Sequence, residues 1–142
     1  MNFVDSRFGL CACSLLLAAL NGCSVSADVN AAGGGSTAPT AGTLTILSSI
    51  EGSTSPSECD FVAATDLELA VYEGARLVTT VTSPCDFFEI SVALSDGIYN
   101  ADVTLLDNGQ AASTTLTLDT LRVAAGTDLQ VEVDFPANSI LP

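Results

Sequence analysis

The sequence predicts an all-β fold, an antiparallel seven-stranded β-sandwich, and three observations support this prediction. Apolar residues recur at every second position in short runs across 43–142, which is the period of a half-buried strand. Turn-forming residues separate these runs at intervals of roughly 8 to 12 residues, as in sandwiches and barrels. After residue 21 no segment has a helical period long enough to connect parallel strands. A small barrel of the same strands is the alternative arrangement.

The clearest strand lies within the stretch 95–109, between a turn at Asp96-Gly97 and another at Asp107-Asn108-Gly109. Small residues in both turns tolerate positive φ and favour a tight reversal of the chain. Alternate side chains between the turns share one face of the strand. This face consists of Tyr99, Ala101, Val103 and Leu105. We expect the other strands to pack around this one.

Six further strands follow from the same alternation of apolar and polar residues, and they occupy residues 43–50, 66–72, 76–82, 87–94, 111–118 and 129–135. The run 87–94 has the most regular apolar face, so we expect it in the core. Glu73-Gly74 is expected to form a hairpin turn, and Pro136 to end the last strand. The segments 51–60 and 121–126 are expected to be connecting chain.

An export signal is predicted at the amino terminus, over residues 1–22. The apolar run Leu10 to Leu20 is shorter than the roughly 20 residues that a membrane-spanning helix needs. Its length fits the apolar region of a secretory signal. The residues that end this region, Leu20-Asn21-Gly22-Cys23, resemble the lipobox of bacterial lipoproteins.

The lipobox resemblance implies that Cys23 receives a lipid and becomes the first residue of the mature chain. Because Ser24, and not an aspartate, follows this cysteine, similarity to enterobacterial sorting implies an outer-membrane location. The membrane would then be a partner through the lipid anchor, since two or three acyl chains hold a protein stably. The alternative is ordinary signal cleavage after Ala27, which would release a freely secreted domain.

Between the signal and the sandwich, residues 23–42 are predicted to be the lipidated cysteine followed by a flexible linker. This segment is rich in Gly, Ser and Ala and has almost no large apolar residues. Such a composition buries too little surface to offset the entropy of ordering the chain. The sandwich domain is therefore expected to comprise residues 43–142.

The five cysteines indicate one disulfide. Cys11 and Cys13 would leave with the signal and Cys23 would carry lipid, so Cys59 and Cys85 remain. An even remainder in an exported chain is typical of a disulfide bond. A metal site at these cysteines is disfavoured, because the chain has no histidine and neither Cys59 nor Cys85 has a second cysteine close to it in the sequence.

Composition excludes several classes of function. The formal net charge is −14, with Arg76 and Arg122 as the basic residues left after cleavage, so nucleic acid would be repelled. Without histidine or lysine, neither a Ser-His-Asp triad nor a Schiff base can form, and we expect no enzyme. Carboxylate pairs such as Glu132 and Asp134 are expected to face solvent from a strand rather than line a catalytic cleft.

Two sets of residues are candidates for binding. Glu58, Asp60 and Asp86 flank the two cysteines, and a disulfide would gather their carboxylates into one neighbourhood. Calcium prefers oxygen ligands of this kind, so the three residues are candidates for a calcium site. Tyr72 and Phe87 fall on the faces opposite the apolar ladders of their strands, where an aromatic side chain can bind a protein or glycan partner.

The Gly97-Ile98-Tyr99 element resembles a strand start in immunoglobulin-like and prealbumin-like sandwiches, where a tyrosine pins the turn. Ala101 stands where antibody domains have a cysteine, and the chain has no tryptophan, so the resemblance is architectural. The whole arrangement of lipobox, linker and small sandwich also resembles short envelope lipoproteins of Gram-negative bacteria. The resemblance implies a lipid-anchored envelope protein with a non-enzymatic binding or structural module. The alternative is a calcium-dependent adhesion or carbohydrate-binding module.

Overall fold

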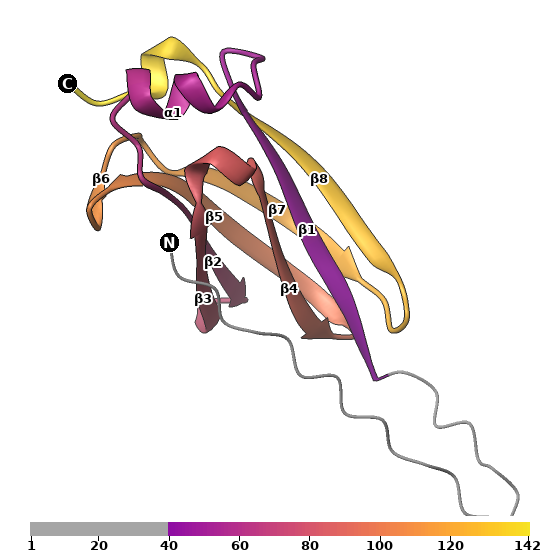
Figure 1. Ribbon diagram of the computed structural model, residues 1–142. Coiled ribbons are helices and arrows are strands. Elements are labelled where there is room, and N and C mark those ends of the chain that lie inside the picture. Colours follow the sequence, from indigo (N-terminus) through magenta and orange to yellow (C-terminus); the bar gives the residue numbers. More distant parts are fainter. Residues whose placement is uncertain (1–39) are drawn as a thin grey trace, which may run out of the picture. The chain divides into compact units, whose positions relative to one another are not determined.

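The computed structural model describes residues 40–142 and confirms the all-β sandwich (Figure 1). The predicted signal peptide, Cys23 and the linker up to residue 39 lie outside the described residues. Within 40–142 no helix has the length and apolar character needed to cross a bilayer. The elements are, in order, β1 (Ala41–Ile50), α1 (Pro56–Phe61), β2 (Asp66–Glu73), β3 (Arg76–Pro84), η1 (Cys85–Phe87), β4 (Glu89–Ser95), β5 (Gly97–Asp107), β6 (Gln110–Ala111), β7 (Leu116–Val123), β8 (Asp128–Phe135) and η2 (Ala137–Ser139).

The strands form two sheets. One has the order β4-β1-β8, and the other has the order β3-β2-β5, with β6 and β7 both paired to β5. All pairings are antiparallel except that of β1 with β8, which is parallel and runs from Thr43 opposite Asp128 to Ile50 opposite Phe135. The first and last strands of the domain therefore lie side by side, a pairing that the expectation of a wholly antiparallel fold did not include.

The core lies between the sheets and consists of the inward faces predicted from the alternation. Tyr99, Ala101, Val103 and Leu105 of β5 are all buried, as expected from the sequence. Since successive side chains of a strand point to opposite faces, each sheet contributes one apolar layer. The largest fully buried side chains are those of Phe135, Leu44, Ile46, Ile50, Leu67, Leu69, Leu105, Val71, Val103 and Val123.

The prediction of one strand over residues 111–118 is wrong. The chain leaves β6 after Ala111, and β7 continues to Val123 through part of the segment expected to be connecting chain. Ser113 interrupts the pairing, because its buried hydroxyl accepts the Leu105 N–H at 2.9 Å and donates to the Thr114 carbonyl at 3.0 Å. A side chain thus replaces one backbone partner, and the strand restarts at Leu116.

A short helix was also not expected. α1 begins with Pro56 inside the segment 51–60 that the sequence predicts as loop, extends to Phe61 and buries Cys59. Proline is favourable at the first helical position, but six residues are too few to show a helical period in the sequence. The domain also begins slightly earlier than expected, because Ala41 and Gly42 already pair with β4.

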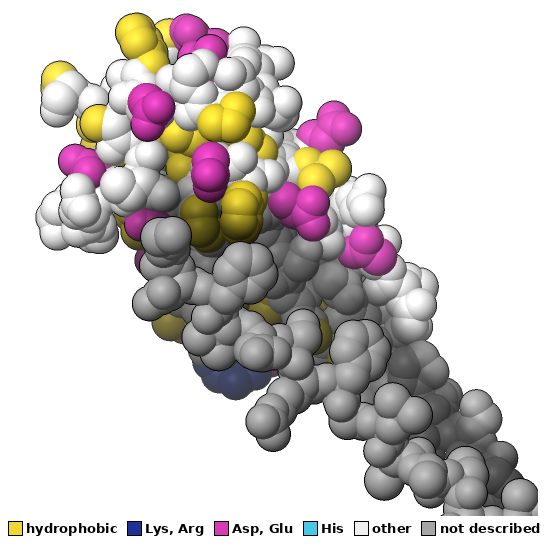
Figure 2. Space-filling view, viewed as in Figure 1, with side chains coloured by type: hydrophobic (Ala, Val, Ile, Leu, Met, Phe, Trp, Pro, Cys, Tyr) yellow, Lys and Arg dark blue, Asp and Glu magenta, His cyan; other side chains and the backbone are white. Residues whose placement is uncertain are grey.

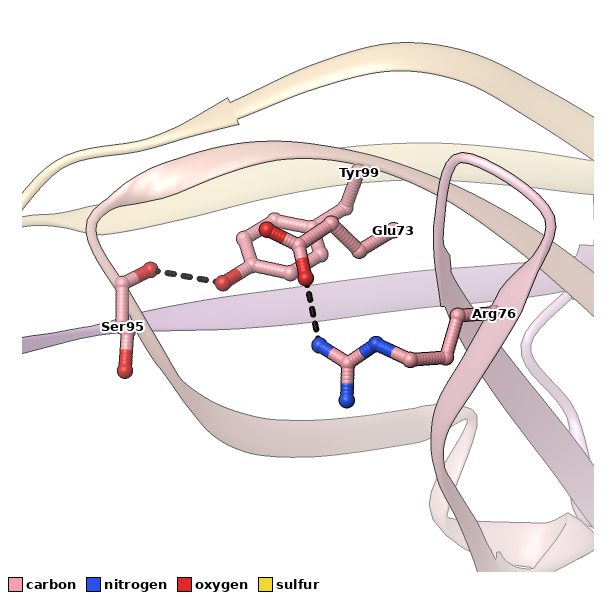
Figure 3. A network of polar contacts seen from close by, with 4 residues as sticks. All are labelled: Glu73, Arg76, Ser95 and Tyr99. Carbon is pink, nitrogen blue, oxygen red and sulfur yellow. Dashed lines mark hydrogen bonds and ion pairs between the residues drawn. The ribbon is translucent and has the colours of Figure 1, made fainter.

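The turn at Asp96-Gly97 has a different role from the one predicted. It does not reverse the chain within one sheet, but carries it from β4 in one sheet to β5 in the other. Gly97 does not have positive φ; a Cβ there would lie 3.1 Å from the ring of Tyr99. The Tyr99 hydroxyl donates a hydrogen bond to the Ser95 carbonyl at 3.0 Å (Figure 3). A tyrosine therefore pins this turn, as the resemblance implied.

The two ends of the sandwich carry different elements (Figure 1). At one end, which we call the entry end, β1 begins near the turns 73–76, 95–97 and 124–127. The exposed Arg76–Glu73 ion pair lies in this region, at the predicted β2–β3 hairpin (Figure 3). At the other end, β1 and β8 finish and α1, η1 and η2 cap the sheets. We call this second end the disulfide end; its residues are 51–65, 84–88, 107–115 and 136–142.

Candidate functional site at the disulfide end

A disulfide between Cys59 and Cys85 holds this end together and confirms the predicted pairing. It joins α1 to η1, with an S–S distance of 2.04 Å and a Cα–Cα distance of 6.0 Å. Backbone hydrogen bonds reinforce the junction, since the Cys85 N–H donates to Thr65 and the Ala64 N–H donates to Cys59. Two segments far apart in the chain are thus fixed to each other.

The same three residues, Cys-Asp-Phe, occur on both sides of this disulfide, as 59–61 and as 85–87. In each copy the cysteine is buried and the phenylalanine is exposed, Phe61 by 83% and Phe87 by 67%. Helical geometry explains this contrast. Residues two apart point roughly 200° apart in an α-helix such as α1 and about 240° apart in a 3₁₀ helix such as η1, so a cysteine that faces the core directs the phenylalanine away from it. The disulfide therefore holds two aromatic side chains in solvent.

Phe61 borders an apolar hollow of about 330 Å³. The hollow lies between the end of α1 and the carboxyl-terminal segment, where Val62, Ile140 and Leu141 contribute its other apolar walls. Leu141 is itself 42% exposed. Only one acidic residue, Glu51, lines this hollow. Its surface can accept an apolar group from another molecule.

Phe87 borders a second, more polar hollow of about 700 Å³, whose walls include Ser49, Glu132 and Asp134. The exposure of Phe87 agrees with its prediction as a surface aromatic, although it lies in η1 and not on a strand. Tyr72 is half-buried on β2, opposite Leu77 beside the hairpin of the entry end. The structure therefore does not bring Tyr72 and Phe87 into one surface.

The disulfide end is acidic. Its segments contain no Lys or Arg, and the two arginines of the described part of the chain, Arg76 and Arg122, belong to the hairpin and to the β5–β7 pairing near the entry end. Figure 2 shows acidic side chains interspersed with hydrophobic ones over the end that carries α1, and a basic side chain toward the opposite end. The acidic residues of the disulfide end are Glu51, Glu58, Asp60, Asp86 and Asp107.

The calcium candidates do not form a metal site in this geometry. Glu58, Asp60 and Asp86 lie near the disulfide as expected, but within residues 40–142 no group of three or more Asp, Glu, Cys or His side chains is placed to hold a metal ion. The expectation that the disulfide would gather three carboxylates around one ion is therefore not supported. Asp60 and Asp86 border one hollow beside the disulfide, but among the described residues no third ligand joins them in an arrangement that could hold an ion.

Comparisons with known proteins find no family model and no curated protein that matches this chain. Among solved structures, the chain is similar to GBS52, the minor pilin of the Gram-positive pathogen Streptococcus agalactiae, with 11% sequence identity and a TM-score of 0.43. The match covers 74% of this chain and 47% of the pilin chain, so this chain spans about half the length of that protein. A likeness of this size bears on neither activity nor partners.

Sequence reasoning missed Phe61, which is the most exposed large apolar side chain in the described residues. Alternation could not identify it, since it lies in a short helix. The signal that could have found it is the repeated Cys-Asp-Phe, because two cysteines that pair place equivalent neighbours at one locus.

Proposed function

We propose that this chain is an exported cell-envelope protein, anchored to the outer membrane by a lipid on Cys23, that presents a non-enzymatic sandwich as a binding module. The observation that carries the proposal is the position of the exposed phenylalanines. Phe61 and Phe87 lie at the disulfide end, whereas the chain from the anchor enters β1 at the opposite end. The contact surface is thus the part of the domain farthest from its point of attachment.

Support for the anchor comes from the amino-terminal sequence. An apolar run of signal length is followed by Leu20-Asn21-Gly22-Cys23, and a Gly-rich segment separates this cysteine from the first strand. A Gly-rich composition predicts a flexible connection, which would let the domain reach away from the bilayer surface.

Support for binding comes from the free energy that the exposed phenylalanines would gain on burial, and from the disulfide that joins the two segments carrying them. Burying a phenylalanine stabilises a complex by roughly 1.5–3 kcal/mol relative to leaving it in water. A disulfide that fixes the backbone segments carrying two such side chains lowers the entropy lost when a partner covers them. Catalysis is disfavoured because the chain has neither histidine nor lysine to act as base or amine nucleophile.

The anchor is tested by the intact mass of the protein purified from its own envelope, before and after reduction and alkylation. We expect a mass that starts at Cys23 with added acyl chains, and two alkylations that occur only after reduction. A mass that starts at Asp28 without lipid would make the protein a freely secreted domain and would remove the membrane half of the proposal.

The contact surface is tested by placing a photoreactive amino acid at position 61, 87 or 98 in the protein expressed in its own cells. Ile98 is the control, since it is 59% exposed and lies at the entry end. We expect one discrete cross-linked species from positions 61 and 87 and none from position 98. Equal cross-linking at all three positions would refute a specific surface at the disulfide end.

A further inference from the structure

The hollow beside Phe61 is shaped for an apolar side chain. Its volume of about 330 Å³ is at the low end of the range for ligand sites, so it accommodates one or two side chains and not a large ligand. Phe61 and Leu141 form exposed rims, and the more buried Val62 and Ile140 lie behind them. α1 carries the Phe61 rim and is held to the core through Cys59.

The charge around the hollow restricts what can occupy it. Glu51 lines the hollow, Glu58 and Asp60 lie on the same short helix as Phe61, and the disulfide end has no basic residue to offset them. A second copy docking by its own disulfide end would bring like charges together at such a contact, and an anionic lipid surface would be repelled. A segment with positive charge meets complementary charge at Glu51 and α1 while its apolar side chains fill the hollow.

We propose that the disulfide end binds a protein segment in which one or two apolar side chains are flanked by Lys or Arg, with an apolar side chain in the hollow between Phe61 and Leu141. This inference rests on the proposed binding function, of which it names the chemistry of the partner. Burial of the apolar anchor supplies the affinity, and Glu51 together with the acidic residues of α1 supplies selectivity for cationic segments and a salt-dependent association.

The test uses the mature chain with Cys23→Ala, which removes only the thiol that would carry lipid, and three fluorescent twelve-residue peptides. The first has two central leucines flanked by lysines, the second has glutamate in place of lysine, and the third has serine in place of leucine. Binding is measured by fluorescence anisotropy. We expect the lysine–leucine peptide to bind at least tenfold more tightly than either of the others. Raising NaCl from 0.05 to 0.5 M should weaken this binding at least threefold, because salt screens the charges of Glu51, Glu58 and Asp60.

Variants locate the binding on the molecule. Phe61→Ser and Leu141→Ser should each weaken binding of the lysine–leucine peptide at least fivefold. Ile98→Ser, at an apolar position of the entry end whose exposure lies between those of Phe61 and Leu141, should leave the affinity for this peptide unchanged. All three positions are exposed, so a thermal melt of each variant serves to show that the fold is retained.

Several outcomes would overturn the inference. These are no binding of the lysine–leucine peptide, equal binding of the lysine and glutamate peptides, or equal loss in the Ile98→Ser control. The proposed function fails separately, through the absence of a discrete cross-link at positions 61 and 87. A cross-linked partner whose contact segment is acidic would leave the binding function in place and refute the chemistry inferred here.

Discussion

The Cys59–Cys85 disulfide should dominate the stability of the disulfide end, and its removal gives a quantitative prediction. The perturbation is the double substitution Cys59→Ala and Cys85→Ala. The two half-cystines are 26 residues apart in sequence. In the chain-entropy model, closing a loop of this length lowers the entropy of the unfolded state by about 12 cal/mol/K, which raises its free energy by about 3.5 kcal/mol at 25 °C. We therefore expect the free energy of unfolding to fall by this amount.

The same loss can be expressed as a melting temperature. The unfolding entropy of a globular domain is roughly 2.1 cal/mol/K per residue, or about 0.2 kcal/mol/K for a domain of this size. A loss of about 3.5 kcal/mol then lowers Tm by about 16 °C. Differential scanning calorimetry measures this shift, and urea titration measures the free energy independently.

Three samples make the measurement decisive: the oxidised protein, the same protein with its disulfide reduced, and the double variant. The reduced protein and the double variant should agree, and reductant should not change the double variant. A loss of unfolding free energy below about 1 kcal/mol in both the reduced protein and the double variant would refute the reasoning. It would mean that opening this loop adds little conformational entropy to the unfolded chain.

Three smaller perturbations test other parts of the fold, each by urea unfolding. Tyr99→Phe leaves the Ser95 carbonyl without its hydroxyl donor and should cost about 1–2 kcal/mol; no loss would mean that water replaces the hydroxyl. Gly42→Ala should cost about 3 kcal/mol, since the new Cβ would lie 2.2 Å from the Ala124 carbonyl oxygen, and a neutral result would show that the adjoining turn yields freely. Arg76→Ala removes an exposed ion pair and should change stability by less than about 1 kcal/mol, so a larger loss would contradict the view that this hairpin pair is solvent-screened.

Much of the sandwich could be predicted because strand period and turn chemistry are local properties. The buried face of β5, the hairpin after Glu73 and the end of the last strand at Phe135 all follow from residues within a few positions of one another. The disulfide followed from counting, since only Cys59 and Cys85 remained after the export signal and the lipid-carrying Cys23 were set aside.

The features that were missed depend on contacts between distant segments. The parallel pairing of β1 with β8 leaves no trace in either strand, because a strand has the same alternation whichever direction its neighbour runs. The break at Ser113 depends on the N–H of Leu105, which a periodicity does not reveal. The absence of a third ligand beside Asp60 and Asp86 likewise depends on how α1 packs against η1, two elements that are distant in the sequence.

The central place of β1 has a mechanical consequence. β1 pairs with β4 on one side and with β8 on the other, and its axis runs from the entry end toward the disulfide end. A pull applied between residue 41 and a contact at the disulfide end acts along the strand, at right angles to its interstrand hydrogen bonds. Such a load is shear: the bonds on both sides share the force and must break together, whereas a hairpin pulled apart at its open end unzips one pair at a time. The domain is thus built to stay folded under tension along its length.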